Sequence, residues 1–64
     1  MDKVQMSKVI RLERKSKLAR GVVECLVRAG LERRLDIRLA SDEQLLAIPG
    51  IEEGDVAEIR RKIG

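Results

Sequence analysis

The fold is decided by residues 45–59, which read Leu45-Leu46-Ala47-Ile48-Pro49-Gly50-Ile51-Glu52-Glu53-Gly54-Asp55-Val56-Ala57-Glu58-Ile59. Proline fixes its own φ and lacks a backbone donor, while glycine can adopt the positive φ of a tight reversal. Because apolar residues stand on both sides of Pro49-Gly50, we expect both arms of the turn to be buried against each other. The stretch predicts two short helices joined by a hairpin, with this scaffold: Ile48, Pro49, Gly50, Ile51, Val56 and Ile59.

Length and composition predict one small domain with a modest, aliphatic core. The chain has 64 residues and no aromatic side chain. Without Phe, Tyr or Trp no base can stack on the protein as it does in single-strand and RNA-recognition folds. No apolar run has the length of a membrane span, and no leader pattern opens the chain. We therefore expect a cytoplasmic protein that does not contact a membrane.

The side chains that most catalytic and metal sites need are missing. The sequence has no histidine and a single cysteine, Cys25, which we expect in the core. The sequence therefore lacks the histidine and cysteine ligands of zinc sites and the histidine of general bases and catalytic triads. The sequence predicts a non-enzyme with no metal, no cofactor and no small-molecule substrate.

Helix signals continue on both sides of the hairpin. Ser16 is positioned to cap a helix over about 17–29, and Gly30 is positioned to end it. The predicted buried stripe of this helix consists of Leu18, Val22, Cys25, Leu26 and Ala29. A Ser41-x-x-Gln44 capping box predicts a helix over 42–47, and the last helix is expected over 54–63, burying Val56, Ile59 and Ile63. Residues 31–40 predict a single turn and a packed connection, with Arg33 and Arg34 on a solvated loop.

Residues 1–15 fit more than one structure. Their apolar residues alternate like a strand but also share one helical face, so an extended arm, a short helix or a strand that pairs with a second copy are all open. The predicted fold is all-α: a compact bundle of four to five short helices over 16–64, containing the hairpin unit and preceded by a basic N-terminal arm over 1–15. A homodimer through residues 1–15 is one predicted contact.

Charge divides the chain unequally. Residues 1–38 carry eleven Lys and Arg against five Asp and Glu, a net +6, whereas residues 39–64 carry three against six, a net −3. A basic half favours polyanions, and an acidic half disfavours phosphate. The candidate nucleic-acid contacts are the basic residues Lys8, Arg11, Arg14, Lys15, Lys17 and Arg20. Two roles are open for Glu52, Glu53 and Asp55. They could form an acidic face that binds a basic protein partner, or they could cap the last helix.

Two related families resemble this sequence. Ile48-Pro49-Gly50-Ile51, followed by eight residues to Ile59, resembles the helix-hairpin-helix motif of DNA-repair and recombination proteins. Residues 18–64 are similar to the C-terminal domain of the bacterial RNA polymerase alpha subunit, on the cues Cys25–Leu31, Ser41–Pro49 and Glu58–Arg60. The resemblance implies a compact bundle of four or five short helices with one helix-hairpin-helix unit and a degenerate second one.

The DNA-contacting residues of those families are not kept. The helix-hairpin-helix motif places a second glycine where this chain has Glu52. The alpha-subunit domain grips the minor groove with an Arg, an Asn, a Gly, a Lys and a Ser, and the matching positions are Gly21, Glu24, Glu52, Gly54 and Asp55. Acidic residues at a phosphate site repel the ligand.

The sequence therefore predicts a small non-enzymatic binding module in a nucleic-acid or transcription setting. It would contact DNA non-specifically through the basic N-terminal half rather than the hairpin. The alternative is a protein–protein adaptor that has lost DNA binding and docks on transcription machinery or on itself.

Overall fold

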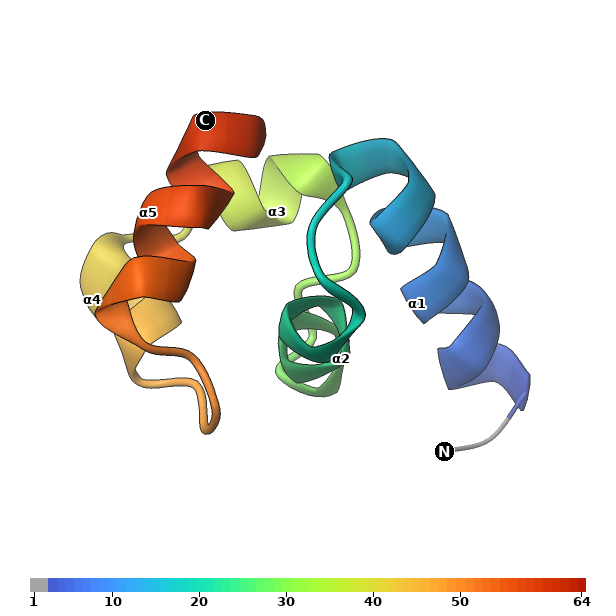
Figure 1. Cartoon of the computed structure of the whole chain (residues 1–64). Coiled ribbons are helices and arrows are strands. Elements are labelled where there is room, and N and C mark those ends of the chain that lie inside the picture. Colours follow the sequence, from blue (N-terminus) through green and yellow to red (C-terminus); the bar gives the residue numbers. More distant parts are fainter. Residues whose placement is uncertain (1–2) are drawn as a thin grey trace.

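Residues 3–64, which the computed structural model describes, form five α-helices and no strand (Figure 1). The predicted all-α class is confirmed. The helices are α1 (Lys3–Ser16), α2 (Arg20–Arg28), α3 (Arg34–Leu39), α4 (Asp42–Leu46) and α5 (Glu53–Lys62).

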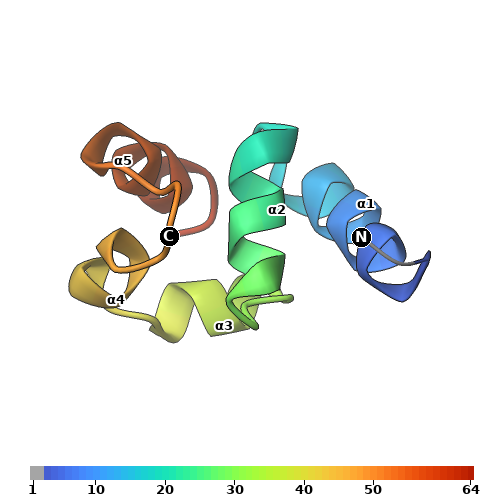
Figure 2. The same ribbon diagram turned by 90° about the horizontal axis from the view of Figure 1, so that it is seen from below.

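Helix α2 lies at the centre of the molecule, between α1 on one side and α4 with α5 on the other (Figures 1 and 2). Helix α3 lies across one end, and the hairpin between α4 and α5 lies at the opposite end (Figure 1). The buried apolar side chains form one cluster to which every helix contributes: Val9, Leu12, Leu18, Val23, Leu26, Val27, Ile37, Leu45, Ile48, Ile51, Val56, Ile59 and Ile63. The core is aliphatic because the sequence has no aromatic residue.

Helix α1 belongs to the core and is not an arm beside it. Val9 and Leu12 are fully buried, and Ser16 follows on the same face. The spacing of three and four residues is that of one helical face, so the helix is the correct choice among the three predicted structures. The strand is excluded for the described residues 3–16. Residues 1 and 2 of the predicted arm lie outside the described range.

The predicted role of Ser16 is wrong. Ser16 ends α1 instead of capping α2: its Oγ donates to the Leu12 carbonyl at 2.7 Å and accepts from the Leu18 amide at 3.3 Å. Lys17 follows with a φ of +60°, in the left-handed region that commonly ends a helix. Helix α2 then begins at Arg20, with Ala19 as an N-cap that makes no side-chain hydrogen bond.

The buried face of α2 is rotated from the predicted stripe. Val23, Leu26 and Val27 are buried, whereas Val22 and Cys25 are only partly buried and Ala29 is exposed. A helix between two neighbours buries a wider face than a one-sided stripe. The predicted C-terminal end is confirmed. Gly30 has a φ of +89°, and its amide and that of Leu31 donate to Val27 and Leu26, the two hydrogen bonds of a Schellman motif.

The second half of the chain follows the sequence more closely. The predicted Ser41–Gln44 capping box is present, with both hydrogen bonds formed, and opens α4. Val56, Ile59 and Ile63 are buried as predicted. Residues 34–39 form a helix of six residues, so the predicted single turn is wrong.

Candidate nucleic-acid interface

The Pro49-Gly50 hairpin is a tight turn packed against α2. The Ile51 amide donates to the Ile48 carbonyl at 3.1 Å, and Gly50 has a φ of +92°. Proline at the second position and a positive φ at the third are typical of a type II turn. A β-carbon on Gly50 would lie 2.7 Å from the Cys25 Sγ, so the hairpin contacts α2 closely at this point. Cys25 is thus a packing residue at the edge of the core.

The acidic residues after the hairpin cap α5. The Glu52 amide donates to the Asp55 Oδ2 at 3.0 Å, and Glu53 is the first residue of the helix. Carboxylates there interact favourably with the helix dipole and with amides that have no partner inside the helix. Asp55 therefore has a structural role, while Glu52 and Glu53 are exposed. The same carboxylates leave this helix end without attraction for phosphate.

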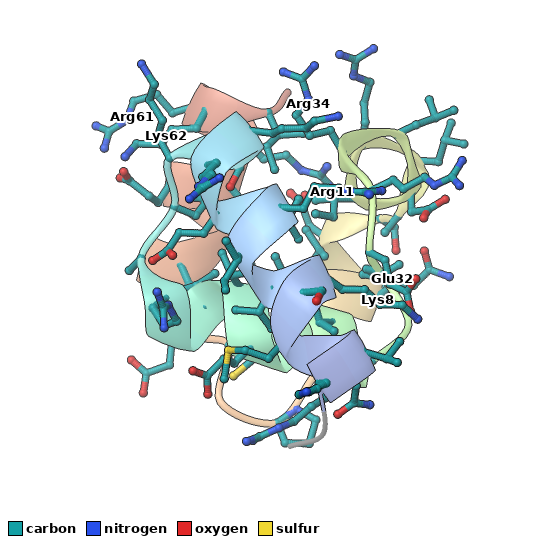
Figure 3. All side chains as sticks on the ribbon, turned by 90° about the vertical axis from the view of Figure 1, so that its right-hand side faces the viewer. Lys8, Arg11, Glu32, Arg34, Arg61 and Lys62 are labelled. Atoms are coloured by element: carbon teal, nitrogen blue, oxygen red, sulfur yellow. The ribbon has the colours of Figure 1, made fainter. Side chains whose placement is uncertain are left out.

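Ion pairs involve two of the predicted DNA-contact residues. The Lys8 Nζ lies 2.8 Å from the Glu32 Oε2, and the Arg20 Nη2 lies 3.0 Å from the Glu13 Oε1. The hydrogen bonds that Arg20 donates to the Glu13 carboxylate raise the pKa of Arg20. Figure 3 shows Lys8 and Glu32 together at the side of α1. These two cations have a carboxylate at hand and are weaker candidates for phosphate.

The other predicted contacts lie on the C-terminal half of α1 and just after it. Arg11, Arg14, Lys15 and Lys17 are exposed, and none forms an ion pair with a carboxylate of residues 3–64. The Lys17 carbonyl accepts a hydrogen bond from the Lys62 Nζ at 2.8 Å, which ties the end of α5 to the end of α1. The ammonium group of Lys17 itself stays exposed.

The structure adds three arginines that the sequence did not assign to this surface. Arg33, Arg34 and Arg38 lie across from α1, and with Arg11 and Lys15 they line a cleft of about 390 Å³ between α1 and α3. Leu12 and Leu35 complete the lining, so no carboxylate lines the cleft. We call Arg11, Lys15, Arg33, Arg34 and Arg38 the cationic cleft. None of its three arginines on the α3 side forms an ion pair with a carboxylate of residues 3–64.

A sequence signal for these arginines existed. Arg34 and Arg38 are four residues apart and therefore share a helical face of α3. The prediction of a turn and a connection over residues 31–40 does not use this spacing, because the four-residue periodicity applies only to a helix. Sequence spacing could not show that this face lies opposite Arg11 and Lys15.

Further cations stand at the same end of the molecule. Arg61 and Lys62, at the end of α5, lie along the same edge as Arg34 (Figure 3). Both interact with one carboxylate, Glu58, and the hydrogen bond from Lys62 lowers the pKa of Glu58. Two cations on one carboxylate leave a local excess of positive charge. The acidic hairpin lies at the opposite end (Figure 1).

The described residues lack two other features, a metal-binding cluster and a membrane-spanning helix. Among residues 3–64, no three His, Cys, Asp or Glu side chains are grouped so that they could hold a metal ion. None of the five helices is long and apolar enough to cross a membrane.

Comparisons with protein-family models, with curated proteins and with solved structures find no match to this chain.

Proposed function

We propose that this domain is a non-enzymatic module that binds nucleic acid through the cationic cleft and the adjoining C-terminal half of α1. The supporting observation is that five cations from α1, α3 and the connection before α3 line one cleft without a carboxylate. Lysine and arginine that neutralise phosphates release condensed counterions, and this release supplies most of the affinity of non-specific binding.

The composition favours duplex DNA contacted along its backbone. No aromatic side chain can stack on an unpaired base, so the phosphates offer the main attraction. Phosphate contacts position a protein on a duplex but carry no direct sequence information. The proposed binding is therefore salt-sensitive and weakly sequence-dependent, with the acidic hairpin turned away from the duplex.

We also propose that this binding takes place in transcription, and only a sequence resemblance supports this part of the proposal. It depends on the resemblance of residues 18–64 to the polymerase alpha-subunit domain, whose DNA-contact positions this chain does not keep. The homodimer through residues 1–15 stays a prediction. Val9 and Leu12 of α1 are buried in the core of the domain and are not available to a second copy. Val4 is an exposed apolar residue of α1 that a second copy could contact.

The test is a salt titration of binding to a short duplex, measured by fluorescence anisotropy. We expect log K to fall linearly with log salt, with a slope of about −0.9 for each phosphate neutralised. Replacing Arg11, Arg14, Lys15 and Lys17 by alanine should make that slope shallower by up to about 3–4, because as many contacts disappear.

A control replaces three cations that each have their own carboxylate partner, Lys8, Arg20 and Arg28, by alanine, and the losses are compared per charge removed. We expect this control to keep most of the salt dependence, because each of these cations has a carboxylate partner. No binding by the natural protein near ~50 mM salt, where a few phosphate contacts should suffice, would refute the proposal. Equal losses per charge removed in the two variants would show that net charge, and not the cleft, attracts the duplex.

A further inference from the structure

Two leucines on α3 are strongly exposed. Leu35 is 58% and Leu39 is 74% exposed, against full burial for Ile37 between them. Residues four apart lie on one face of a helix, and this face points away from the one that carries Ile37. We call Leu35 and Leu39 the leucine ridge. It runs along the outer side of a six-residue helix that has only one residue in the core.

The surroundings of the leucine ridge distinguish it from scattered surface leucines, which are normal. On one side Leu35 lines the cationic cleft. On the other side Leu39 lines a shallow groove of about 350 Å³, whose walls are mainly apolar: Ala29, Leu31, Leu39, Ala40, Gln44 and Ile48. The surface therefore has an apolar centre, with the arginines of the cationic cleft on the Leu35 side and a mainly apolar groove on the Leu39 side; Asp36 is the exposed carboxylate of α3. An apolar centre with a charged rim is typical of protein–protein interfaces.

We propose that the leucine ridge and its flanks dock an acidic amphipathic helix of a protein partner. Apolar side chains of that helix would cover Leu35 and Leu39 and enter the groove beside Leu39. Its carboxylates would pair with Arg34 and Arg38, whose guanidinium groups form no ion pair with a carboxylate of residues 3–64. Helix-in-groove recognition uses such i, i+3, i+4 and i+7 anchors.

The chemistry favours this occupant over the others. A phosphate backbone would satisfy the arginines but would leave the two leucines without an apolar partner. A lipid surface is held by more buried apolar area than two leucines provide. The absence of carboxylates from the cleft lining selects an acidic partner, and the ridge selects one with apolar side chains. The inference does not depend on nucleic-acid binding.

The experiment uses the full chain and a synthetic 18-residue helical peptide with leucines on one face and glutamates on the other. We expect saturable binding by anisotropy and a loss of at least about tenfold in affinity for the Leu35→Ser/Leu39→Ser variant. Leu46→Ser is the matched control, since Leu46 is 41% exposed on α4, and it should bind as the natural protein does. A second variant, Leu35→Ala/Leu39→Ala, should show the same loss with less change in polarity.

Two further arms test charge and separate this inference from the proposed function. A peptide with glutamine in place of glutamate should bind at least about tenfold more weakly, because its pairing with Arg34 and Arg38 is gone. Binding of duplex DNA should be unchanged in the single variant Leu39→Ser, because Leu39 does not line the cationic cleft, whereas the same variant should weaken peptide binding. If DNA binding fails in every variant while the peptide result holds, the proposed function is wrong and this inference stands.

Several results would overturn the inference. The first is no peptide binding, or binding that the leucine changes leave intact. The second is equal affinity for the glutamate and glutamine peptides. The third is that the leucine changes abolish binding to anionic lipid vesicles or abolish a dimer seen by sedimentation while leaving peptide binding intact, which would assign the ridge to a membrane or to a second copy.

Discussion

Gly50 shows at the level of one residue why the hairpin has the sequence it has. Its φ of +92° is in a region that L side chains rarely adopt, and the space where a β-carbon would stand is taken by the Cys25 Sγ. Backbone conformation and packing thus demand glycine independently. The two demands can be separated experimentally, because only one of them involves Cys25.

Gly50→Ala should lower the free energy of unfolding by about 2–4 kcal/mol, from the left-handed backbone and from the overlap with sulfur. Adding Cys25→Ala removes the overlap, so the double variant should lose less than the sum of the two single changes. Chemical denaturation of all three proteins measures this coupling. Gly21→Ala is the control: nothing lies within 4 Å of its added β-carbon, and in a helix it should stabilise by about 0.5–1 kcal/mol. Strict additivity of Gly50→Ala and Cys25→Ala would contradict the contact.

Arg60 shows what residue-level reading of the sequence missed. A cation in the last turn of a helix interacts favourably with the helix dipole, and the sequence pattern around Arg60 indicates no further role. In the structure its Nε donates to the Asp42 Oδ1 at 2.8 Å, and its Nη atoms donate to the carbonyls of Ile37, Ala40 and Gly64. One side chain thus satisfies carbonyls at the end of α3 and connects α3, α4 and α5. No local pattern identifies Asp42, Ile37 and Ala40 as partners, because they are 18, 23 and 20 residues away.

At the level of elements, helix ends were predictable where the signal is local. The Gly30 ending and the Ser41–Gln44 box need only residues three to five positions apart, and both are present. The Ser16 prediction was wrong because serine fits either end of a helix: its hydroxyl can bond a later amide as a cap or the carbonyl four residues earlier. Which occurs at Ser16 depends on whether α1 packs in the core.

Helix α1 supplies the next prediction. Leu12 is fully buried, so Leu12→Ala should cost about 2–5 kcal/mol. A domain of this size has roughly 3–5 kcal/mol in all, so cooperative thermal unfolding followed by circular dichroism should be largely lost. Val4→Ala, at a position 63% exposed, is the matched control and should change stability by less than about 0.5 kcal/mol. If α1 were a detachable arm, the two changes would be equally mild.

The sequence also predicts only part of the candidate interface, the part that depends on local charge. The basic half of the chain and the acidic hairpin were visible as charge along the sequence. The assembly of Arg33, Arg34 and Arg38 opposite α1 was not, because it depends on how α3 crosses the end of the bundle (Figure 1). Lys8 and Arg20 were indistinguishable from the other cations until their carboxylate partners were placed.

For the whole molecule, charge is arranged as two ends. The cationic cleft and the ends of α1 and α5 lie at one end, and the acidic hairpin lies at the other (Figure 1). Six ion pairs balance charge elsewhere among residues 3–64, but the cleft keeps like charges together without a partner. Like charges that line one cleft repel each other, so we expect the cleft to lower the stability of the domain in the absence of a ligand.

The loss of stability caused by charge repulsion in the cleft can be tested best at Arg34. Arg34 is the first residue of α3, where the helix dipole disfavours a cation, it lies four residues before Arg38, and it lines the cleft with Arg11 and Lys15. All three interactions have the same sign. Arg34→Gln should therefore raise the free energy of unfolding by about 0.5–1 kcal/mol at low salt, and the gain should shrink toward 1 M salt as screening lengths fall to ~3 Å.

The same Arg34→Gln change should weaken duplex binding and reduce its salt slope by about 0.9, because one phosphate contact is lost. Arg28→Gln is the control: Arg28 pairs with Glu24 at 3.9 Å in α2, so its replacement should not stabilise the protein. Denaturation and duplex binding measured on the same samples would show stability rising as affinity falls. If Arg34→Gln destabilises the domain, or stabilises it equally at all salt concentrations, repulsion in the cleft is not the cause. A gain in stability at the expense of binding is what a surface retained for a ligand, and not for the fold, should show.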